Sequence, residues 1–258
     1  MIIKPNKLKV VGLKYEDKGY SLIEVSLADF MKERFMETVV YLIRHSVRFN
    51  NNTMIESYRT DQEYLIKNEK IILSVKGEKR AEILSNEKEL QDMDVVYTSN
   101  CVRTLQTAKY LLDKQNLKVN IDDRFDERRT GLKENEKIPY LFKKQCDDPT
   151  FKAPNGESQL DVRKRMYEAL MEVISNNKGK RIAIFSHAYA MMFLLLKWCK
   201  LIEVRNDQEL AFCFKDKVVF DKGINSPDVF KLIFNEECEL ISIENIIFDD
   251  LEYDDFDI

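Results

Sequence analysis

The chain is poor in glycine and proline, with 7 and 5 of them among 258 residues. It also lacks a run of eighteen apolar residues, and no basic stretch followed by an apolar one stands near its start. The first scarcity excludes a collagen-like chain, and the other two absences argue against a membrane-spanning or secreted protein. Hydrophobic residues make up 44% of the sequence, which excludes a wholly disordered chain. We therefore expect a soluble globular protein, built as one α/β domain with extensions or as two small domains.

Cysteine is present in an odd number and without close pairs. The five cysteines stand at 101, 146, 199, 213 and 238, and no two of them form a CxxC motif. This spacing argues against a disulfide framework and against a zinc site made of four thiolates. We expect reduced thiols and a cytoplasmic protein with no membrane partner.

An excess of charge of one sign is confined to the end of the chain. Of the 45 acidic groups, six fall in residues 249–258, so 39 acidic groups face all 41 basic groups in the rest. A nearly neutral body lacks the basic face that nucleic-acid binding requires, and we expect no such partner. The basic residues at 128–129 and 163–165 are local exceptions, and we interpret 163–165 as a solvated helix face. The acidic tail 249–258 is expected to be mobile.

Short, continuous apolar runs alternate with amphipathic stretches through the middle of the chain, which is typical of a parallel sheet covered by helices. We predict strands at 38–44, 94–98, 117–121 and 181–186, and helices at 75–90, 101–115, 158–177 and 188–201. The expected fold is an α/β three-layer sandwich with a mainly parallel sheet flanked by helices. The long segment 121–157 has little apolar periodicity, so we expect a functional lid or rim there.

The two ends of the chain are predicted to carry β-hairpins. Residues 1–37 indicate two strands joined by a polar turn that ends in Gly19, followed by a short helix near 28–35, and we interpret them as an N-terminal extension. Residues 228–248 indicate a second hairpin, which we interpret as a C-terminal extension at the end of a domain that spans 38–248. Exposed strand pairs can associate with each other or with a second subunit, so the sequence leaves open whether the protein forms a homodimer.

Only two histidines occur, His45 and His187, and each directly follows a predicted strand. Ligands bind beyond the carboxyl ends of the strands in an open parallel sheet, so both imidazoles are expected in one site. Arg44, Arg103 and Glu127 are predicted at the same edge, which gives a cationic pocket with one acid. Guanidinium groups there suit phosphoryl transfer, because they can neutralise the charge on the transferring oxygens.

No metal or cofactor is expected at this pocket. Two histidines offer too few ligands for a histidine-rich metal site, and no cluster of Asp and Glu has ligand spacing. The motif GxxxxGK[ST] is absent, which argues against a P-loop nucleotide site.

Six short segments of the sequence are informative because of the order in which they occur along the chain. They are VVYLIRHSVRFNN (39–51), LSVKGEKRA (73–81), VVYTSNCVRTLQTA (95–108), FDERRTG (125–131), PNGES (154–158) and IAIFSHA (182–188). In this order they resemble the motifs of the histidine phosphatase superfamily, in its phosphoglycerate mutase-like branch. Six matches in family order are a far more specific signal than any one of them.

The arrangement and the resemblance together imply a mechanism. Neutral His45 would attack phosphorus and form a phosphohistidine, which water then hydrolyses. Arg44, Arg103 and a protonated or hydrogen-bonding His187 would hold the phosphoryl oxygens. Glu127 would protonate the leaving oxygen and then deprotonate the attacking water.

Three other positions in the motifs bear on the pocket. Asn51, in preference to Asn50, matches a family asparagine that contacts the phosphoryl group. Ser46 and Ala188 stand where the family has glycine, at points where the backbone approaches the ligand. Both side chains are small, so we expect the pocket to survive these departures.

The sequence favours a metal-independent phosphomonoester hydrolase over a phosphoglycerate mutase-like phosphotransferase. Only 29 residues separate Glu127 from Glu157, whereas the mutases carry a much longer insertion there that closes over the substrate. An open pocket admits water, which favours hydrolysis. A non-catalytic module that binds phosphate or phosphoproteins, and a structural protein that dimerises through its ends, remain alternatives. The expected substrate is a phosphorylated small molecule, and a phosphoprotein stays possible.

Overall fold

A computed structural model gives the structure of most of the chain. The described residues are 9–16, 19–26, 37–49, 61–132, 136–207 and 209–251, with the backbone alone for 9–16, 19–26 and 61–65. The helix predicted near 28–35 lies outside the described residues.

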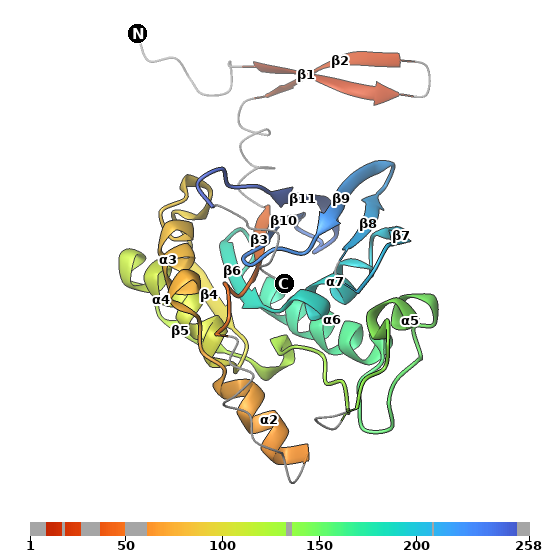
Figure 1. Cartoon of the computed structure of the whole chain (residues 1–258). Helices are drawn as coiled ribbons and strands as arrows, with labels where there is room; N and C mark the ends of the chain where they lie inside the picture. Colours follow the sequence, from red (N-terminus) through yellow and green to blue (C-terminus); the bar gives the residue numbers. More distant parts are fainter. Residues whose placement is uncertain are drawn as a thin grey trace.

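A six-stranded sheet forms the centre of the fold (Figure 1). Its strands, in spatial order, are β11 (Leu240–Ile246), β10 (Val229–Phe234), β3 (Thr38–Arg44), β6 (Arg181–Ser186), β4 (Val95–Thr98) and β5 (Val119–Ile121). The last four run parallel to one another, whereas β10 and β11 are antiparallel to their neighbours. The predicted α/β fold with a mainly parallel sheet is confirmed, and strands 38–44 and 181–186 have the predicted bounds.

Helices cover both faces of this sheet. The described α-helices are α2 (Asp61–Lys70), α3 (Val75–Leu84), α4 (Val102–Gln115), α5 (Leu141–Asp147), α6 (Gln159–Asn176) and α7 (Ala188–Leu195). Alternate residues of β3 point to opposite faces, as the pleat of a strand requires. Val40 and Leu42 pack in one hydrophobic cluster with residues of α6 and α7, and Tyr41 and Ile43 pack in another with residues of α3 and α4. Two helical layers therefore enclose the sheet.

The hairpin predicted at 228–248 is present as β10–β11, but it lies within the central sheet and is not an extension. β10 pairs with β3 over six residue pairs, so the hairpin β10–β11 completes the central sheet. The sequence shows that two strands follow one another, but their pairing with a strand almost two hundred residues earlier is a tertiary contact.

The helix predicted for 188–201 ends at Leu195, and a three-stranded antiparallel sheet follows it. This second sheet consists of β7 (Lys200–Val204), β8 (Glu209–Phe214) and β9 (Lys217–Gly223). The apolar run continues past Leu195 to Leu196, and Trp198 and Cys199 follow after a single lysine. An apolar run by itself does not reveal where a buried helix stops.

The two ends of the chain differ in how they match expectation. β1 (Lys9–Glu16) and β2 (Gly19–Ser26) form the predicted antiparallel pair. At the other end, Phe248 and Leu251 are buried in the cluster beside α3 and α4. The start of the acidic tail is therefore docked, which corrects the expected mobility for residues 249–251.

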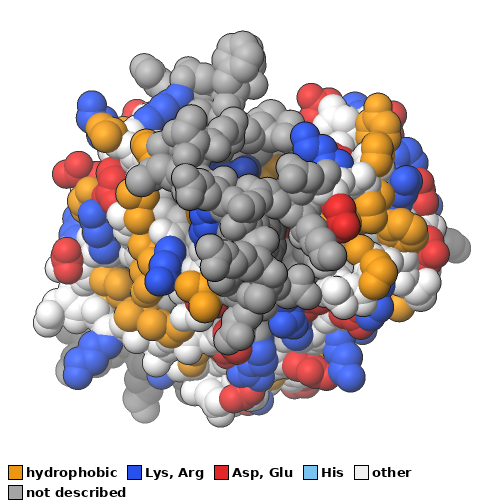
Figure 2. Space-filling model, turned by 60° about the horizontal axis from the view of Figure 1, so that its bottom comes forward, with side chains coloured by type: hydrophobic (Ala, Val, Ile, Leu, Met, Phe, Trp, Pro, Cys, Tyr) orange, Lys and Arg blue, Asp and Glu red, His pale blue; other side chains and the backbone are white. Residues whose placement is uncertain are grey.

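The surface carries both signs of charge. Figure 2 shows basic and acidic side chains intermingled over the described part of one face, in keeping with the near balance of 41 basic and 45 acidic groups. Among the described helices, none is both long and apolar enough to cross a membrane.

Candidate active site

The structure brings the two histidines together. His45 directly follows β3 and His187 directly follows β6, and these strands are parallel neighbours in which Arg44 pairs with Ser186. The two imidazole centroids lie 5.2 Å apart, with the rings at 64°. Both side chains are buried. Adjacent strands thus deliver both imidazoles to one site.

One ring nitrogen of His45 is fixed by the backbone. Nδ1 lies 2.7 Å from the carbonyl oxygen of Ser46, which can only accept, so Nδ1 carries the proton and donates it. Burial, followed by the positive charges of Arg103 and Arg44, holds the pKa of His45 well below its usual value. The ring is therefore neutral at pH 7, and its Nε2 has a free lone pair.

His187 is also held as a neutral ring, and both of its nitrogens are hydrogen-bonded within the protein. Nη2 of Arg103 lies 3.0 Å from Nδ1 and Oγ of Ser99 lies 2.8 Å from Nε2. Arginine only donates, so Nδ1 accepts and Nε2 donates to Ser99. Burial and then Arg103 lower the pKa of His187 well below its usual value.

The two predicted phosphate-binding arginines lie close to these rings. Arg103, in the first turn of α4, donates from Nη1 to the carbonyl oxygen of Asn68 at 2.6 Å. Arg44 donates from Nη1 to the carbonyl oxygens of Ile224 and Asn225, at 2.8 and 2.9 Å. Nε of each arginine is buried without a hydrogen-bond partner among the described residues. The centre is therefore positively charged and keeps unused N–H donors, which suits an anionic phosphoryl group.

Glu127 lies beside the helix that follows His187. Its Oε1 accepts from the backbone N–H groups of Ala190 at 2.9 Å and Arg128 at 2.8 Å, and its Oε2 accepts from Tyr189 at 3.3 Å. These contacts dock the carboxylate on the first turn of α7, where the N–H groups of a helix have no partner within the helix. The Glu127 carboxylate is therefore held at the start of the helix that directly follows His187.

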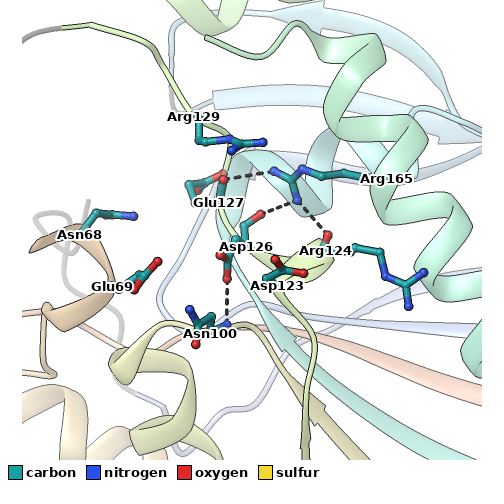
Figure 3. Close-up of a pocket in the computed structure, with 9 residues that line it drawn as sticks. All are labelled: Asn68, Glu69, Asn100, Asp123, Arg124, Asp126, Glu127, Arg129 and Arg165. Carbon is teal, nitrogen blue, oxygen red and sulfur yellow. Dashed lines mark hydrogen bonds between the residues drawn. The ribbon is translucent and has the colours of Figure 1, made fainter. Parts of the chain in front are cut away.

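An open cavity of about 310 Å³ adjoins Glu127 (Figure 3). The described residues that line it all have polar or charged side chains, and they are Asn68, Glu69, Asn100, Asp123, Arg124, Asp126, Glu127, Arg129 and Arg165. They come from the end of α2, the loop before α4, the 3-10 helix η3 (Asp123–Phe125) with the loop after it, and α6. The segment 121–157 thus supplies most of the cavity wall, as expected for a rim.

Asp126 is a residue of this cavity that sequence reasoning missed. Its Oδ1 accepts from the backbone N–H of Asn100 at 2.8 Å, and burial raises its pKa to about 6. A carboxylate oxygen of Asp126 lies within 4.8 Å of a ring nitrogen of His187. The only signal in the sequence was its position next to Glu127.

Cys101, Asp126 and His187 form the one group in the described part of the chain whose potential metal-ligand atoms all lie within 4.8 Å of one another. Both ring nitrogens of His187 already hydrogen-bond, to Arg103 and Ser99. A cation there would have to displace one of these contacts beside a buried guanidinium, which repels it. The contacts therefore do not fit a metal site.

Glu157, from the PNGES motif, holds the rim of the cavity in place. It accepts from Nε and Nη2 of Arg165 at 2.8 and 3.0 Å and from the backbone N–H of Arg129 at 2.8 Å. Burial alone would raise the pKa of Glu157, but the hydrogen bond and charge of Arg165 bring it below its usual value. Arg165 also donates to the carbonyl oxygens of Arg124 and Asp126 (Figure 3). Interpreting 163–165 as a solvated face is therefore wrong for Arg165.

The loop after His45 is shaped by a close approach to α3. A Cβ atom on Gly77 would lie 2.0 Å from the carbonyl oxygen of Val47, so only glycine fits there. Ser46, which replaces the family's glycine, is fully buried and donates its N–H to Oγ1 of Thr107 at 3.0 Å. Its hydroxyl has no partner among the described residues. Asn51 lies outside the described residues.

A comparison with protein families matches residues 40–209 to the histidine phosphatase superfamily (branch 1). The match covers more than half of the chain, and the protein belongs to this superfamily. The resemblance found in the six motifs is thus confirmed.

Relatives in the superfamily carry different activities in their names. Phosphoserine phosphatase 1 of Hydrogenobacter thermophilus is 29% identical over 140 residues, which are 51% of this chain and 65% of that protein. The match therefore spans slightly less than two thirds of that relative. A Yersinia enterocolitica protein named "Probable phosphoglycerate mutase GpmB" is 29% identical over 164 residues, 60% of this chain and 72% of that protein.

Solved structures show the same fold. A mycobacterial glucosyl-3-phosphoglycerate phosphatase in complex with inorganic phosphate aligns with a TM-score of 0.56 and 15% identity, over 82% of this chain and 96% of that one. A phosphoglycerate mutase from Bacillus anthracis aligns with a TM-score of 0.55 and 14% identity, over 81% and 92%. The protein is thus similar to phosphatases and mutases alike.

Proposed function

We propose that the protein hydrolyses phosphomonoesters through a phosphohistidine on His45, without a metal ion. The observation that carries this proposal is the tautomer of His45. Its Nδ1–H donates to the carbonyl oxygen of Ser46, which leaves Nε2 as a free nucleophile in a buried, positively charged site. Activation of a nucleophile requires a free lone pair at neutral pH, and this arrangement supplies it.

In the first step, Nε2 of His45 attacks phosphorus while the bond from phosphorus to the ester oxygen breaks. The ring becomes positively charged as the P–N bond forms, and the Ser46 carbonyl oxygen, 2.7 Å from Nδ1, stabilises that charge. Arg44 and Arg103 surround the phosphoryl oxygens with positive charge and N–H donors, and His187 holds Arg103 in place through its Nδ1. A proton passes from the Glu127 carboxyl group to the leaving oxygen.

In the second step, water attacks the phosphohistidine from the side that the leaving alcohol vacated. The Glu127 carboxylate takes a proton from that water, the P–N bond breaks, and its electron pair returns to Nε2 of His45. Inorganic phosphate leaves, and the starting protonation states are restored. The enzyme needs no redox partner and no second substrate other than water.

Two features favour hydrolysis over transfer to a second substrate. The cavity beside Glu127 is open, so water can reach the site. The segment between Glu127 and Glu157 has only 29 residues, and α5 and short turns occupy the described part of it. A mutase must instead exclude water while the phosphoryl group moves between substrates. The relative named as a phosphoserine phosphatase also supports hydrolysis.

Release of inorganic phosphate tests this function. Wild-type protein and His45→Ala are incubated in EDTA with a panel of phosphomonoesters, and circular dichroism checks that both are folded. We expect release by the wild type and a loss of at least about 10³-fold in the variant, because the nucleophile is gone. Equal release by both proteins would refute the assignment of His45, and dependence on 2,3-bisphosphoglycerate would favour a mutase.

We further propose that the enzyme works in the reducing cytoplasm on a small phosphorylated molecule. The cysteine spacing of the sequence supports the location, and the polar cavity supports the kind of substrate.

A further inference from the structure

The described residues that line the cavity beside Glu127 all have polar or charged side chains, and this restricts what the leaving group can be. Glu127 belongs both to this cavity and to the proposed reaction, because it docks on the helix that follows His187. Because Glu127 would protonate the leaving oxygen, its proposed role puts the alcohol part of the ester in this cavity during the first step. This inference deepens the proposed function and rests on it.

The cations of the cavity wall already have partners. Arg165 is bound by Glu157 and by three backbone carbonyl oxygens. The side chain of Arg124 points away from the cavity in Figure 3 and donates to Asp122 and Glu172. Arg129 contacts Glu157 at 3.5 Å. Among the described cations of the wall, Arg165 and Arg124 are thus occupied, and the exposed Arg129 keeps N–H groups that a leaving group could use.

The carboxylates of the wall are in the opposite state. The side chains of Glu69 and Asp123 have no hydrogen-bond or ion-pair partner among the described residues. Asp126 uses only Oδ1, in the contact with Asn100, and its Oδ2 remains free to accept. The amide groups of Asn68 and Asn100 flank these acids in Figure 3. The cavity thus offers unused hydrogen-bond acceptors beside the reacting centre.

Asp126 is the acceptor best placed for a substrate. It lies within 4.8 Å of a ring nitrogen of His187, which puts it next to the phosphoryl site. The groups that face it are Glu69 on α2, Asn100 and Cys101 before α4, Asp123 on η3 and Arg165 on α6. A free carboxylate oxygen at this place can accept a hydrogen bond from a substrate donor that lies a few bonds from the ester oxygen.

We propose that the substrate is a phosphomonoester of a small hydrophilic alcohol that carries hydroxyl or ammonium donors, and that Asp126 determines this specificity by accepting a hydrogen bond from one of them. Donors on the leaving group would satisfy the free acceptors of the cavity, whereas an alkyl or aryl group would leave them unpaired. Hydrogen bonds to a charged partner discriminate strongly, and we expect a preference of about tenfold or more.

Four esters that share a three-carbon chain test the proposal. They are n-propyl phosphate, glycerol 3-phosphate, 3-aminopropyl phosphate and 3-phosphooxypropanoate, which differ in the groups they present to the cavity. Values of kcat/KM are measured in EDTA at pH 8, where the Asp126 carboxyl group is ionised. We expect glycerol 3-phosphate or 3-aminopropyl phosphate to exceed n-propyl phosphate by about tenfold or more.

Asp126→Asn keeps an oxygen that can accept from Asn100 but removes the charge. We expect it to reduce the ratio of kcat/KM between the donor-bearing ester and n-propyl phosphate to about threefold or less, mainly through a higher KM. Asp113→Asn is the matched control, because Asp113 is exposed on α4 away from the cavity, and it should leave the ratio as in the wild type.

The outcomes separate this inference from the proposed function. Equal hydrolysis of all four esters, a preference for the carboxylate-bearing 3-phosphooxypropanoate, or an unchanged ratio in Asp126→Asn would overturn the inference while hydrolysis itself stands. Absence of hydrolysis, together with absence of phosphoryl label on His45 from any of the esters, would instead overturn the proposed function and the inference with it.

Discussion

His45, Arg103 and His187 are buried at the ends of two neighbouring strands and a helix, whereas the cavity beside them is open and lined by partly exposed side chains such as Glu69. In the buried centre, Nδ1 of each ring is held by a hydrogen bond: His45 donates to the Ser46 carbonyl oxygen, and His187 accepts from Arg103. In the cavity, carboxylates of Glu69 and Asp126 keep free acceptors. The buried centre, which would bind the phosphoryl group, is therefore preorganised. The carboxylates of the cavity, which would bind the alcohol, keep unused acceptors before the substrate arrives.

This difference follows from what each region must recognise. Every phosphomonoester presents the same phosphoryl group, so fixed donors and charges suit it and cost no reorganisation during the reaction. Alcohols differ among substrates, and the cavity contributes through its pattern of donors and acceptors. Changes in the centre should thus affect all substrates alike, and changes in the cavity should affect some more than others.

The largest effect is expected from Arg103→Lys. A lysine ammonium cannot keep the contacts to His187 and Asn68 and still face the phosphoryl group, because it lacks the planar guanidinium fork. We expect kcat/KM to fall by about 10²- to 10³-fold for every ester. Steady-state kinetics and vanadate binding measure this. Arg205→Lys, in the loop that directly follows β7, is the control. A loss that depends strongly on the alcohol would break the distinction between centre and cavity.

Gly77→Ala tests how the loop after His45 is held. The new Cβ would lie 2.0 Å from the Val47 carbonyl oxygen, so the loop must move. We expect a loss of about 2 kcal/mol in the free energy of unfolding, and lower kcat for all esters. Gly223→Ala is the control, since its Cβ meets only Cγ of Glu209, at 3.8 Å. Equal stability of the two variants in urea denaturation would contradict the close packing.

Acid should destabilise the protein through His45. Its pKa in the folded state is lowered by burial, so the unfolded state binds the proton first and stability is lost as pH falls through about 6.5. Between pH 7.5 and 5.0, the wild type should lose about 2 kcal/mol more than His45→Gln. Asp126, whose pKa is raised to about 6, acts in the opposite direction but is common to both proteins. Parallel pH profiles in urea denaturation would show that His45 is not held neutral.

Ser46→Ala should have the smallest effect. The variant removes a buried hydroxyl that has no partner among the described residues. We expect the free protein to gain about 1 kcal/mol of stability, because an unsatisfied polar group is no longer buried. Thermal denaturation with and without vanadate measures this. A large loss of stability without vanadate would mean that the hydroxyl already has a partner.

The sequence predicts the centre better than the cavity for a physical reason. His45 and His187 follow strongly apolar, β-branched strands whose parallel pairing carries both side chains to one edge, so local pattern and general topology suffice. Asp126 lines a cavity whose wall comes from α2, the loop before α4, η3 and α6. Such a wall forms only when segments that are distant in the sequence pack together, so no local sequence pattern predicts it.

Strand pairing shows the same limit at the level of the fold. The bounds of 38–44 and 181–186 follow from their apolar runs. The place of β10 in the central sheet depends on its pairing with β3, and β7–β9 depend on where the buried helix α7 stops. Packing decides both outcomes, and it leaves little trace in the local sequence.

The most direct test of the account is to identify the phosphorylated intermediate. Protein mixed with a ³²P-labelled ester is quenched within milliseconds and digested, and the labelled peptide is mapped. The account predicts an acid-labile, base-stable label on the peptide that contains His45, absent from His45→Ala and lost to water in the wild type as inorganic phosphate appears. Turnover without any label on His45, or with the label on another residue, would contradict it.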